Sequence, residues 1–283
     1  MDTYYFLLCF FIYGFLGWCT EVGFAAFKEH RFVNRGFLNG PICPIYGVGV
    51  TAVIAFLTPL EGNILLLYLS SVFLVTFLEG ATGWAMDKIF HNKWWDYSDQ
   101  PFNIGGYVCL IFSLIWGVCC VAIMKFIHPL IHKGIALLPH TLGILLIAIL
   151  GIALLADLYV TASAIFKFNR RLATMEKIAG ELHEISDQIG SDIYEKVILA
   201  MEKQETSRQK LDQAASGFLD KTQEVSEEIH IKIADLKARY QELGSKSSKV
   251  TLRLVKAFPK MESRKYKLQL EEFQKKLEEK IKR

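Results

Sequence analysis

The first 166 residues alternate long apolar runs with short polar stretches, and the rest of the chain has shorter apolar repeats among charged residues. A helix needs roughly 20 apolar residues to cross a bilayer, at a rise of about 1.5 Å per residue. Five segments approach that length and predict transmembrane helices, at residues 4–27, 42–60, 63–85, 105–127 and 139–166. The predicted fold class is therefore all-α, a polytopic membrane bundle of about five helices with a helical tail.

Beyond the bundle, apolar residues recur every three or four positions, which is typical of amphipathic helices. Between Val225 and Leu243 the steps are those of a coiled-coil seam. The pattern divides the chain into a bundle at 1–166, amphipathic or coiled-coil helices at 167–245 and a basic amphipathic segment at 246–283. The seam fits either a hairpin that folds on itself or a surface for a partner helix, such as a second copy in a homodimer.

The distribution of charge favours one orientation. Residues 1–166 contain 7 Lys and Arg against 9 Asp and Glu, whereas residues 167–283 contain 25 against 20. Short loops rich in Lys and Arg stay in the cytoplasm, and such residues follow the first, third and fifth predicted helices. We therefore expect a plasma-membrane protein with its N-terminus outside and its C-terminus in the cytoplasm, although Lys125 and Lys133 count mildly against this orientation.

Three carboxylates interrupt the apolar helices at similar depth. Glu21, Glu79 and Asp157 each lie 16 to 18 residues after the start of a helix that runs inward. A charge within the membrane is costly, so it marks a functional site unless it reaches water or pairs with a nearby cation. Gly14 and Gly17 share a helical stripe with Glu21, and glycines at this spacing let another backbone approach. The sequence therefore points Glu21 into the bundle.

Two inner loops add polar candidates at the same face. The first contains Gly and Pro at positions that exclude a continuous helix, which indicates either a plain turn or a re-entrant element lining a polar cavity. The second contains tryptophans typical of a membrane interface. The candidate substrate-binding residues, all expected around one cytoplasm-facing cavity, are Glu21, Asn34, Arg35, Tyr46, Glu79, Asp96, Tyr97, Asn103 and Asp157.

The tail suggests a lipid partner. Residues 246–267 carry eight Lys and Arg against one acid, Glu262, with apolar residues between them. Such a segment suits the anionic inner leaflet, although a solvated basic face is the simpler interpretation. Nucleic acid is not expected, because the membrane offers a nearer anionic surface. No cofactor, metal site or catalytic residue is predicted: the six cysteines lack ligand spacing, and His128 and His132 have no third ligand at a motif distance.

Several strings together resemble a known family. These are "GFLGWCTEV", "NRGFLNGPICPIYGVG", "LEGATGWAMDKIFHNKWWDYSDQPFNIGGY" and "LVKAFPKMESRKY", and they are similar to the ABC-transporter type IV permeases, or CmpB-like membrane proteins. The resemblance implies a permease of the bacterial cell membrane, without naming a substrate. Because the chain has no GxxxxGK[ST] phosphate loop, a permease role implies a separate ATPase subunit or an ion gradient.

Three functions fit these observations. The first is a transporter permease component with a cytoplasm-facing polar cavity. The second is an intramembrane enzyme acting on a lipid or isoprenoid, in which carboxylates transfer protons and aromatic rings shield a cation. The third is a scaffold in which the bundle only anchors a functional coiled-coil tail. Because the chain has no phosphate loop, none of these functions makes it a P-loop ATPase.

Overall fold

The computed structural model describes residues 2–203 and 211–282 and confirms the all-α prediction, since 78% of the chain is helical. The chain forms two compact units. The membrane unit combines residues 1–167 with residues 248–283, and the hairpin unit comprises residues 168–247. The membrane unit is therefore assembled from two stretches that lie far apart in the sequence.

The membrane unit contains the apolar helices that the sequence predicts. They are α1 (Thr3–Glu29), α2 (Pro44–Leu57) with the 3₁₀ turn η1 (Thr58–Leu60), α3 (Ile64–Phe90), α4 (Leu110–Ala122), the π-helical turn η2 (Ile123–Ile127), α5 (His128–Ala136) and the first part of α6 (His140–Lys203). Within the described residues, four helices are long and apolar enough to cross a membrane, and the helix at Pro44–Leu60 is shorter. These findings agree with the expected number of about five.

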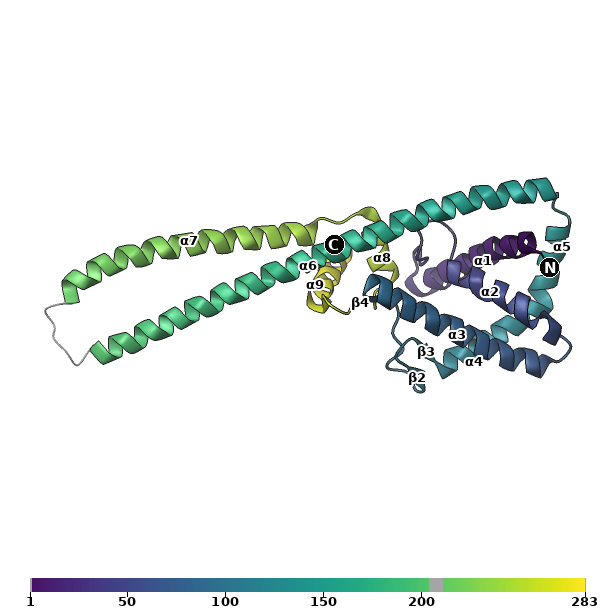
Figure 1. Ribbon diagram of the computed structural model, residues 1–283, viewed down its shortest axis with the longest axis horizontal. Coiled ribbons are helices and arrows are strands. Elements are labelled where there is room, and N and C mark those ends of the chain that lie inside the picture. The colour runs from purple at the N-terminus through teal and green to yellow at the C-terminus, as the bar shows by residue number, and fades with distance from the viewer. Residues whose placement is uncertain (1, 204–210, 283) are drawn as a thin grey trace. The chain divides into compact units, whose positions relative to one another are not determined.

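Connections gather at the two ends of the bundle. Residues 30–43 and 91–109 form the loops after α1 and α3, at what we call the loop end. The start of α1, the turn at residues 58–63 and the turn at residues 137–139 form the turn end (Figure 1). Each spanning helix thus connects an end with long irregular segments to an end with tight turns.

The core at the turn end depends on a close contact between α1 and α2. Its buried residues come mainly from these two helices, with contributions from α3, α4, η2 and α5: Tyr5, Leu8, Cys9, Tyr13, Val50, Val53, Ile54, Leu57, Leu67, Cys120, Met124 and Ile135. A Cβ atom on Gly47 of α2 would lie 2.6 Å from the backbone oxygen of Phe10. Since that oxygen belongs to α1 itself, glycine permits the short distance between the helices.

The loop after α3 is compact rather than extended. Strand β2 (Asn103–Ile104) pairs antiparallel with β3 (Val108–Cys109), and Gly105 and Gly106 between them have positive φ angles of 60° and 73°. A Cβ on Gly106 would also lie 2.2 Å from Asp96 Oδ1. Position 106 therefore requires glycine for two reasons, the positive φ angle and the close approach of the Asp96 side chain.

The C-terminal segment folds onto the loop end. Ser248 caps α8 (Lys249–Ala257), and β4 (Glu262–Ser263) and α9 (Lys267–Lys282) follow. Strand β4 pairs antiparallel with β1 (Asn92–Lys93), the segment directly after α3. The ring of Phe258 packs edge-on against Trp94, which is 4% exposed, with 5.1 Å between centroids. Strand pairing and aromatic packing thus join residues 248–283 to the membrane unit.

The hairpin unit contains the second part of α6 and all of α7 (Leu211–Ser245), which runs back in the opposite direction (Figure 1). Phe168, Leu172, Met175, Ile178 and Leu236 are its buried apolar residues in the described part. The positions expected from the amphipathic spacing between residues 192 and 226 lie outside the side chains that the structure describes.

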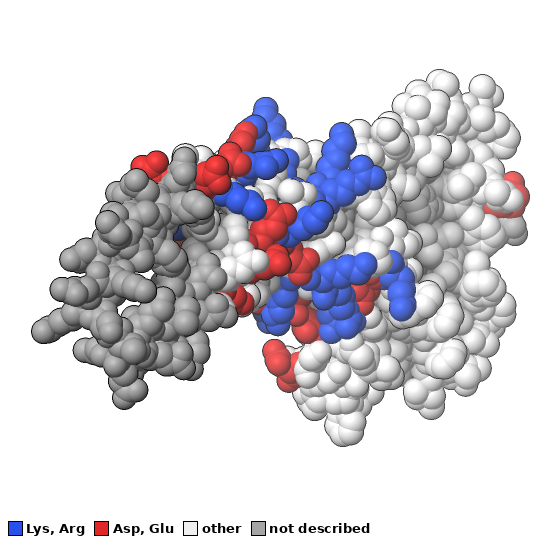
Figure 2. Space-filling view, turned by 60° about the vertical axis from the view of Figure 1, so that its left-hand side comes forward, with Lys and Arg blue, Asp and Glu red and all other residues white. Residues whose placement is uncertain are grey.

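The membrane unit exposes apolar side chains where lipid is expected. Phe73, Phe77 and Ile152 are between 64% and 77% exposed on α3 and α6. Figure 2 shows a broad face of this unit that is almost free of Lys, Arg, Asp and Glu. A water-soluble protein rarely presents so large an apolar surface, so these helices match a hydrocarbon environment.

The glycine contact between α1 and α2 gives a first testable prediction. Gly47→Ala places a methyl group against the Phe10 carbonyl, and overpacking of this kind costs about 1–3 kcal/mol. Gly49→Ala on the same helix is the control, because a Cβ there meets nothing within 4 Å. Thermal unfolding in detergent should show a lower melting temperature for Gly47→Ala alone; equal melting temperatures for the two variants would contradict the close packing.

Candidate functional site

Two carboxylates inside the bundle each accept a hydrogen bond from a tyrosine. Tyr46 Oη of α2 donates to Glu21 Oε1 of α1 over 2.6 Å. Tyr97 Oη, from the loop after α3, donates to Glu79 Oε1 of α3 over 3.2 Å. We call these four residues the tyrosine–carboxylate cluster. Each pair joins two separate elements, so the cluster forms only when the bundle folds.

Glycines on α1 explain why Tyr46 reaches Glu21. A Cβ on Gly17 would lie 2.4 Å from the Tyr46 side chain, and one on Gly14 would lie 3.0 Å from Ile42. Glu21 follows Gly17 by four residues and therefore lies on the same face of α1. The stripe that the sequence places inside the bundle faces the beginning of α2, and Glu21 is its polar end.

A second stripe on α3 faces the following loop. Gly83, four residues after Glu79, would bring a Cβ to 3.0 Å from the Tyr107 ring. Asp87, another turn further on, accepts a hydrogen bond of 2.5 Å from Tyr107 Oη and one of 2.7 Å from Arg264 Nη2. The hydrogen bond to Asp87 raises the pKa of the Tyr107 phenol. This face of α3 thus positions the loop and the C-terminal segment next to Glu79.

The two tyrosine–carboxylate pairs influence each other electrostatically. Burial raises the pKa of the Tyr97 phenol, and the negative charge of Glu79 and, more weakly, that of Glu21 raise it further. Phe112 and Trp116, one turn apart on α4, contact Tyr97 and Tyr46, so the two pairs lie along one face of that helix. The four side chains therefore form one polar region that α1, α2, α3 and the second loop share.

Aromatic rings of α4 pack on both tyrosines. Phe112 stacks on Tyr97 with ring centroids 5.0 Å apart, and Trp116 lies edge-on to Tyr46 at 5.7 Å. These rings give the cluster an aromatic border on the α4 side. The faces of such rings carry partial negative charge, which attracts cations.

The two carboxylates differ in how their charge is balanced. Arg35 Nε lies 3.7 Å from Glu21 Oε2, and the Arg35 guanidinium also lies over the Phe24 ring, 5.7 Å from its centroid. Glu79 Oε2, by contrast, is buried and has no hydrogen-bond partner among the described residues. Since a buried carboxylate oxygen without a donor is unfavourable, Glu79 is the group in the cluster best suited to accept a proton or a cation.

Asp157, which the sequence placed in the same cavity, instead holds the first loop. Its Oδ1 accepts hydrogen bonds from the backbone and side-chain nitrogens of Asn39, at 3.1 and 2.7 Å. Its Oδ2 accepts one of 2.6 Å from the Gly40 backbone, and Thr161, one turn further along α6, also donates to Oδ1. Its partners among the described residues are thus loop and helix groups, and the carboxylate fixes the chain where it turns toward α2.

Arg253 of α8 also holds this loop, but as a hydrogen-bond donor where Asp157 is an acceptor. Its guanidinium donates to the backbone oxygens of Gly36 at 2.7 Å and Phe37 at 2.9 Å, and its Nε donates to Asn39 Oδ1 at 3.1 Å. Burial lowers the pKa of Arg253, and the charge of Asp157 opposes this shift. An arginine nevertheless remains protonated in proteins. We call residues 34–40, held between Asp157 and Arg253, the clamped loop.

The clamped loop connects the candidate residues of α1 to those of α2. Asn34 Oδ1 accepts a hydrogen bond of 2.8 Å from Trp18 Nε1, and Asn34 Nδ2 donates to the Asn39 backbone. Arg35 beside it pairs with Glu21. Asn34 therefore has a supporting position, whereas Arg35 contacts the cluster directly.

Asp96 and Asn103 shape the second loop and do not contact the cluster carboxylates within the described part of the chain. Asp96 Oδ1 accepts hydrogen bonds from Ser98 and from Lys93 Nζ. Burial works against ionisation here, yet these hydrogen bonds hold the pKa of Asp96 below its usual range. Asn103 donates to the backbone of Ser98 and Gln100. Of the nine candidates, the structure brings together Glu21, Arg35, Tyr46, Glu79 and Tyr97.

Asn39, Arg253 and Arg264 lie outside the candidate set and also help to position this site. Arg253 and Arg264 belong to the basic segment that the sequence predicts to bind lipid, but each of them has a protein partner. The apolar residues around Arg253 were the available signal, because Leu254 and Val255, which follow it directly, are both 3% exposed. A basic residue next to buried apolar positions indicates a helix that packs on protein.

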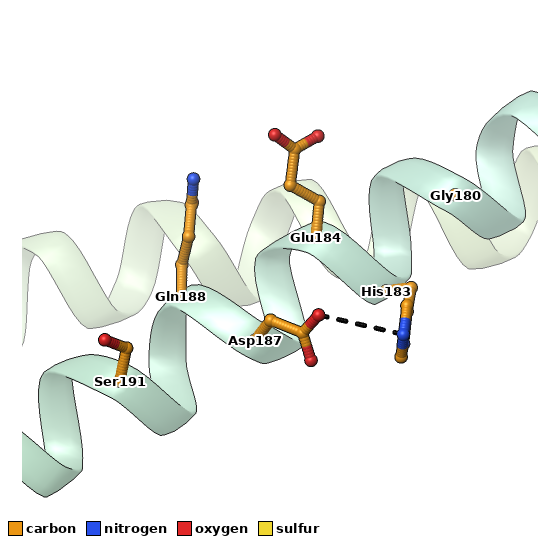
Figure 3. Close-up of a pocket in the computed structure, with 6 residues that line it drawn as sticks. All are labelled: Gly180, His183, Glu184, Asp187, Gln188 and Ser191. Atoms are coloured by element: carbon orange, nitrogen blue, oxygen red, sulfur yellow. Dashed lines mark ion pairs between the residues drawn. The ribbon is translucent and has the colours of Figure 1, made fainter.

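No group of three or more His, Cys, Asp or Glu side chains suited to hold a metal ion occurs in the part of the chain that the structure describes. Figure 3 shows a surface hollow on α6 in the hairpin unit, lined by Gly180, His183, Glu184, Asp187, Gln188 and Ser191. His183 Nε2 lies 3.7 Å from Asp187 Oδ2, and both side chains are more than 70% exposed. All these residues come from one helix, so the hollow lacks the converging polar groups of a binding site.

The fold and the site define a polytopic α-helical membrane protein with intramembrane carboxylates near one end of its bundle. A family model described as "Putative ABC-transporter type IV" matches residues 8–162, more than half of the chain. The chain belongs to this family, which confirms the resemblance noted in its sequence. No curated protein and no solved structure matches the chain.

The clamped loop gives a second prediction. Arg253→Gln leaves backbone oxygens of the loop without their donors, at a cost of about 1–3 kcal/mol for each buried group. Hydrogen exchange at the Gly40 amide, which binds Asp157, should accelerate at least tenfold. Lys256→Gln removes the same charge from an exposed position of α8 and serves as the control. An unchanged exchange rate in Arg253→Gln would show that Asp157 holds the loop alone.

Proposed function

We propose that this protein is the membrane component of a transporter and binds a cationic or proton-exchanging polar solute at the tyrosine–carboxylate cluster. The observation that carries the proposal is Glu79, whose Oε2 is buried without a hydrogen-bond partner among the described residues. Membership of the ABC-transporter type IV family supports a role in transport.

The charge of the cluster favours a cation over an anion. Glu21 faces Arg35, whereas the hydrogen-bond partner of Glu79 among the described residues is the hydroxyl of Tyr97. An ionised carboxylate in such surroundings lacks a counter-ion, and burying a lone charge costs several kcal/mol. An amine that enters would neutralise Glu79, and the aromatic rings of Tyr97, Phe112 and Trp116 would stabilise its positive charge.

The proposal assigns the loop end to the cytoplasm, in keeping with the positive residues that follow α1 and α3. The solute would then enter or leave beside the clamped loop. Since this chain has no phosphate loop, a separate ATPase subunit or an ion gradient supplies the energy. The seam on α7 would hold a partner helix or a second copy. Exposed lysines of the C-terminal segment would bind anionic lipids: Lys249, Lys256, Lys260 and Lys265.

The aromatic border of the cluster also favours one alternative, an intramembrane enzyme acting on a lipid or isoprenoid. Stacked rings beside a carboxylate suit a reaction with a cationic intermediate, in which Glu79 would transfer a proton. The two functions predict different outcomes for purified protein. An enzyme would change the chemical structure of an extracted lipid, and a transporter would return its solute unaltered.

Binding of cations tests the proposal directly. Purified protein in lipid nanodiscs is heated with tetramethylammonium, choline or spermidine, and with acetate as the anionic comparison. A cation that binds should raise the melting temperature, since a ligand at 100 times its Kd adds about 2.7 kcal/mol. Glu79→Gln should abolish this increase, and Asp99→Asn, at an exposed loop position, should keep it. Stabilisation of Glu79→Gln by the same cation would overturn the proposed site.

Replacement of the hairpin unit distinguishes a transporter from a membrane-anchored scaffold. Residues 168–247 are replaced by about 20 Gly and Ser residues, a flexible linker with a reach of roughly 25 Å. This variant keeps Arg253 and Arg264, and we expect it to keep the cation-dependent stabilisation. A chain that ends before residue 172 should lose it, because the clamp is then missing. A linker variant that folds and binds no cation would favour a functional tail.

A further inference from the structure

A second polar network lies at the turn end, apart from the tyrosine–carboxylate cluster. Tyr5 Oη contacts two histidines, His132 Nδ1 at 2.9 Å and His128 Nε2 at 3.3 Å. Tyr13 Oη contacts the remaining nitrogen of His128, Nδ1, at 3.1 Å. The four side chains form a continuous series of hydrogen bonds in the order His132, Tyr5, His128, Tyr13.

This series leads from the surface into the core. His132 is exposed, whereas Tyr5, His128 and Tyr13 are 8%, 6% and 3% exposed. Tyr5 and Tyr13 are eight residues apart on α1, which corresponds to about 12 Å along the helix axis. The hydrocarbon core of a bilayer is about 30 Å thick, so the series covers more than a third of that thickness.

The local backbone places His128 in this position. The His128 backbone N–H donates to the Ile123 oxygen, five residues earlier, which is the hydrogen bond of the π-helical turn η2. Pro129 follows and has no N–H to continue the regular pattern. Single π turns inside helices occur often at functional sites. Here the turn directs His128 inward between two tyrosines of α1.

The chemistry of the series allows two opposite arrangements of its protons. A neutral imidazole has one N–H donor and one acceptor nitrogen, and a phenol both donates and accepts. When His132 Nδ1–H donates to Tyr5, Tyr5 donates to His128 Nε2, and His128 Nδ1–H donates to Tyr13. When Tyr13 donates to His128 instead, every hydrogen bond is reversed and His128 holds the other tautomer.

We propose that these four residues form a proton relay between the surface of the turn end and the interior of the bundle. Protonated His132 passes its Nδ1 proton to the Tyr5 oxygen, and Tyr5 passes its own proton to His128 Nε2. His128 then releases its Nδ1 proton to the Tyr13 oxygen, and the Tyr13 hydroxyl proton passes to a water molecule in the bundle. One proton enters at His132, one leaves at Tyr13, and each bond that breaks is replaced.

Charged and titratable groups lie around the relay. Cys9 of α1 interacts with Tyr5, and Glu61, after η1, acts electrostatically on His128. Lys125 Nζ donates to the Glu61 backbone oxygen over 2.6 Å. The relay does not depend on which solute the tyrosine–carboxylate cluster binds.

Nitrogen-15 NMR of histidine-labelled protein in liposomes tests the relay. If the two proton arrangements interchange rapidly, the ring nitrogens of His128 should give exchange-averaged signals. These signals are assigned to His128 by their absence from the spectrum of His128→Gln. Tyr5→Phe should restore two distinct signals of one tautomer. Two distinct signals in the unmodified protein would overturn the relay, because a purely structural network holds one fixed tautomer. Glu79→Gln should leave the averaging of the His128 signals unchanged. A failure of the proposed solute site can therefore be distinguished from a failure of the relay.

Proton entry into the same liposomes tests whether the relay conducts protons. The external solution is acidified, a pH-sensitive dye inside reports proton entry, and valinomycin prevents a membrane potential. His128→Gln should lower the entry rate at least tenfold. Its amide can keep both hydrogen bonds, so an unchanged melting temperature verifies folding. His140→Gln is the control, since His140 is exposed and its ring packs on Tyr4. Equal rates for His128→Gln and the unmodified protein would overturn the proposal.

Discussion

The clamped loop is the constraint on which the rest of the site depends. Irregular backbone at the edge of a membrane must find partners for its N–H and C=O groups, because lipid supplies none. Asp157 accepts hydrogen bonds from the N–H groups of Asn39 and Gly40, and Arg253 donates to the oxygens of Gly36 and Phe37. A carboxylate thus binds N–H groups of the loop, and a guanidinium binds its backbone oxygens. The loop held in this way leads into α2 and so positions Tyr46.

Much of the bundle follows from the sequence because its signals are local. Runs of apolar residues define the helices, and the spacing of Gly14, Gly17 and Glu21 identifies the inward face of α1 without knowledge of its neighbour. The pairing of Glu21 with Tyr46 is less local, yet the glycines indicate where another backbone approaches. Sequence reasoning succeeds where a residue's environment depends on positions within one or two helical turns.

The parts that sequence reasoning missed depend on contacts between distant segments. Asp157 has the same polarity and depth as Glu79, but Asn39 and Gly40 lie more than 100 positions away in the sequence and decide its role. Arg253 and Arg264 look like lipid-facing cations until their carbonyl and carboxylate partners are known. Asp96 and Asn103 are polar and belong to the predicted inner face, yet the tight turns around Gly106 use that polarity within the loop itself.

The membrane unit is completed by residues that follow the hairpin unit in the sequence. Arg253 and Arg264 follow the whole hairpin unit, so α1 to α6 leave the translation machinery while the loop end still lacks both arginines. Nascent protein accordingly passes through a stage in which the helices are inserted but the backbone oxygens of the clamped loop lack their guanidinium partner. The loop end therefore obtains its full set of hydrogen bonds only after the hairpin unit has been synthesised.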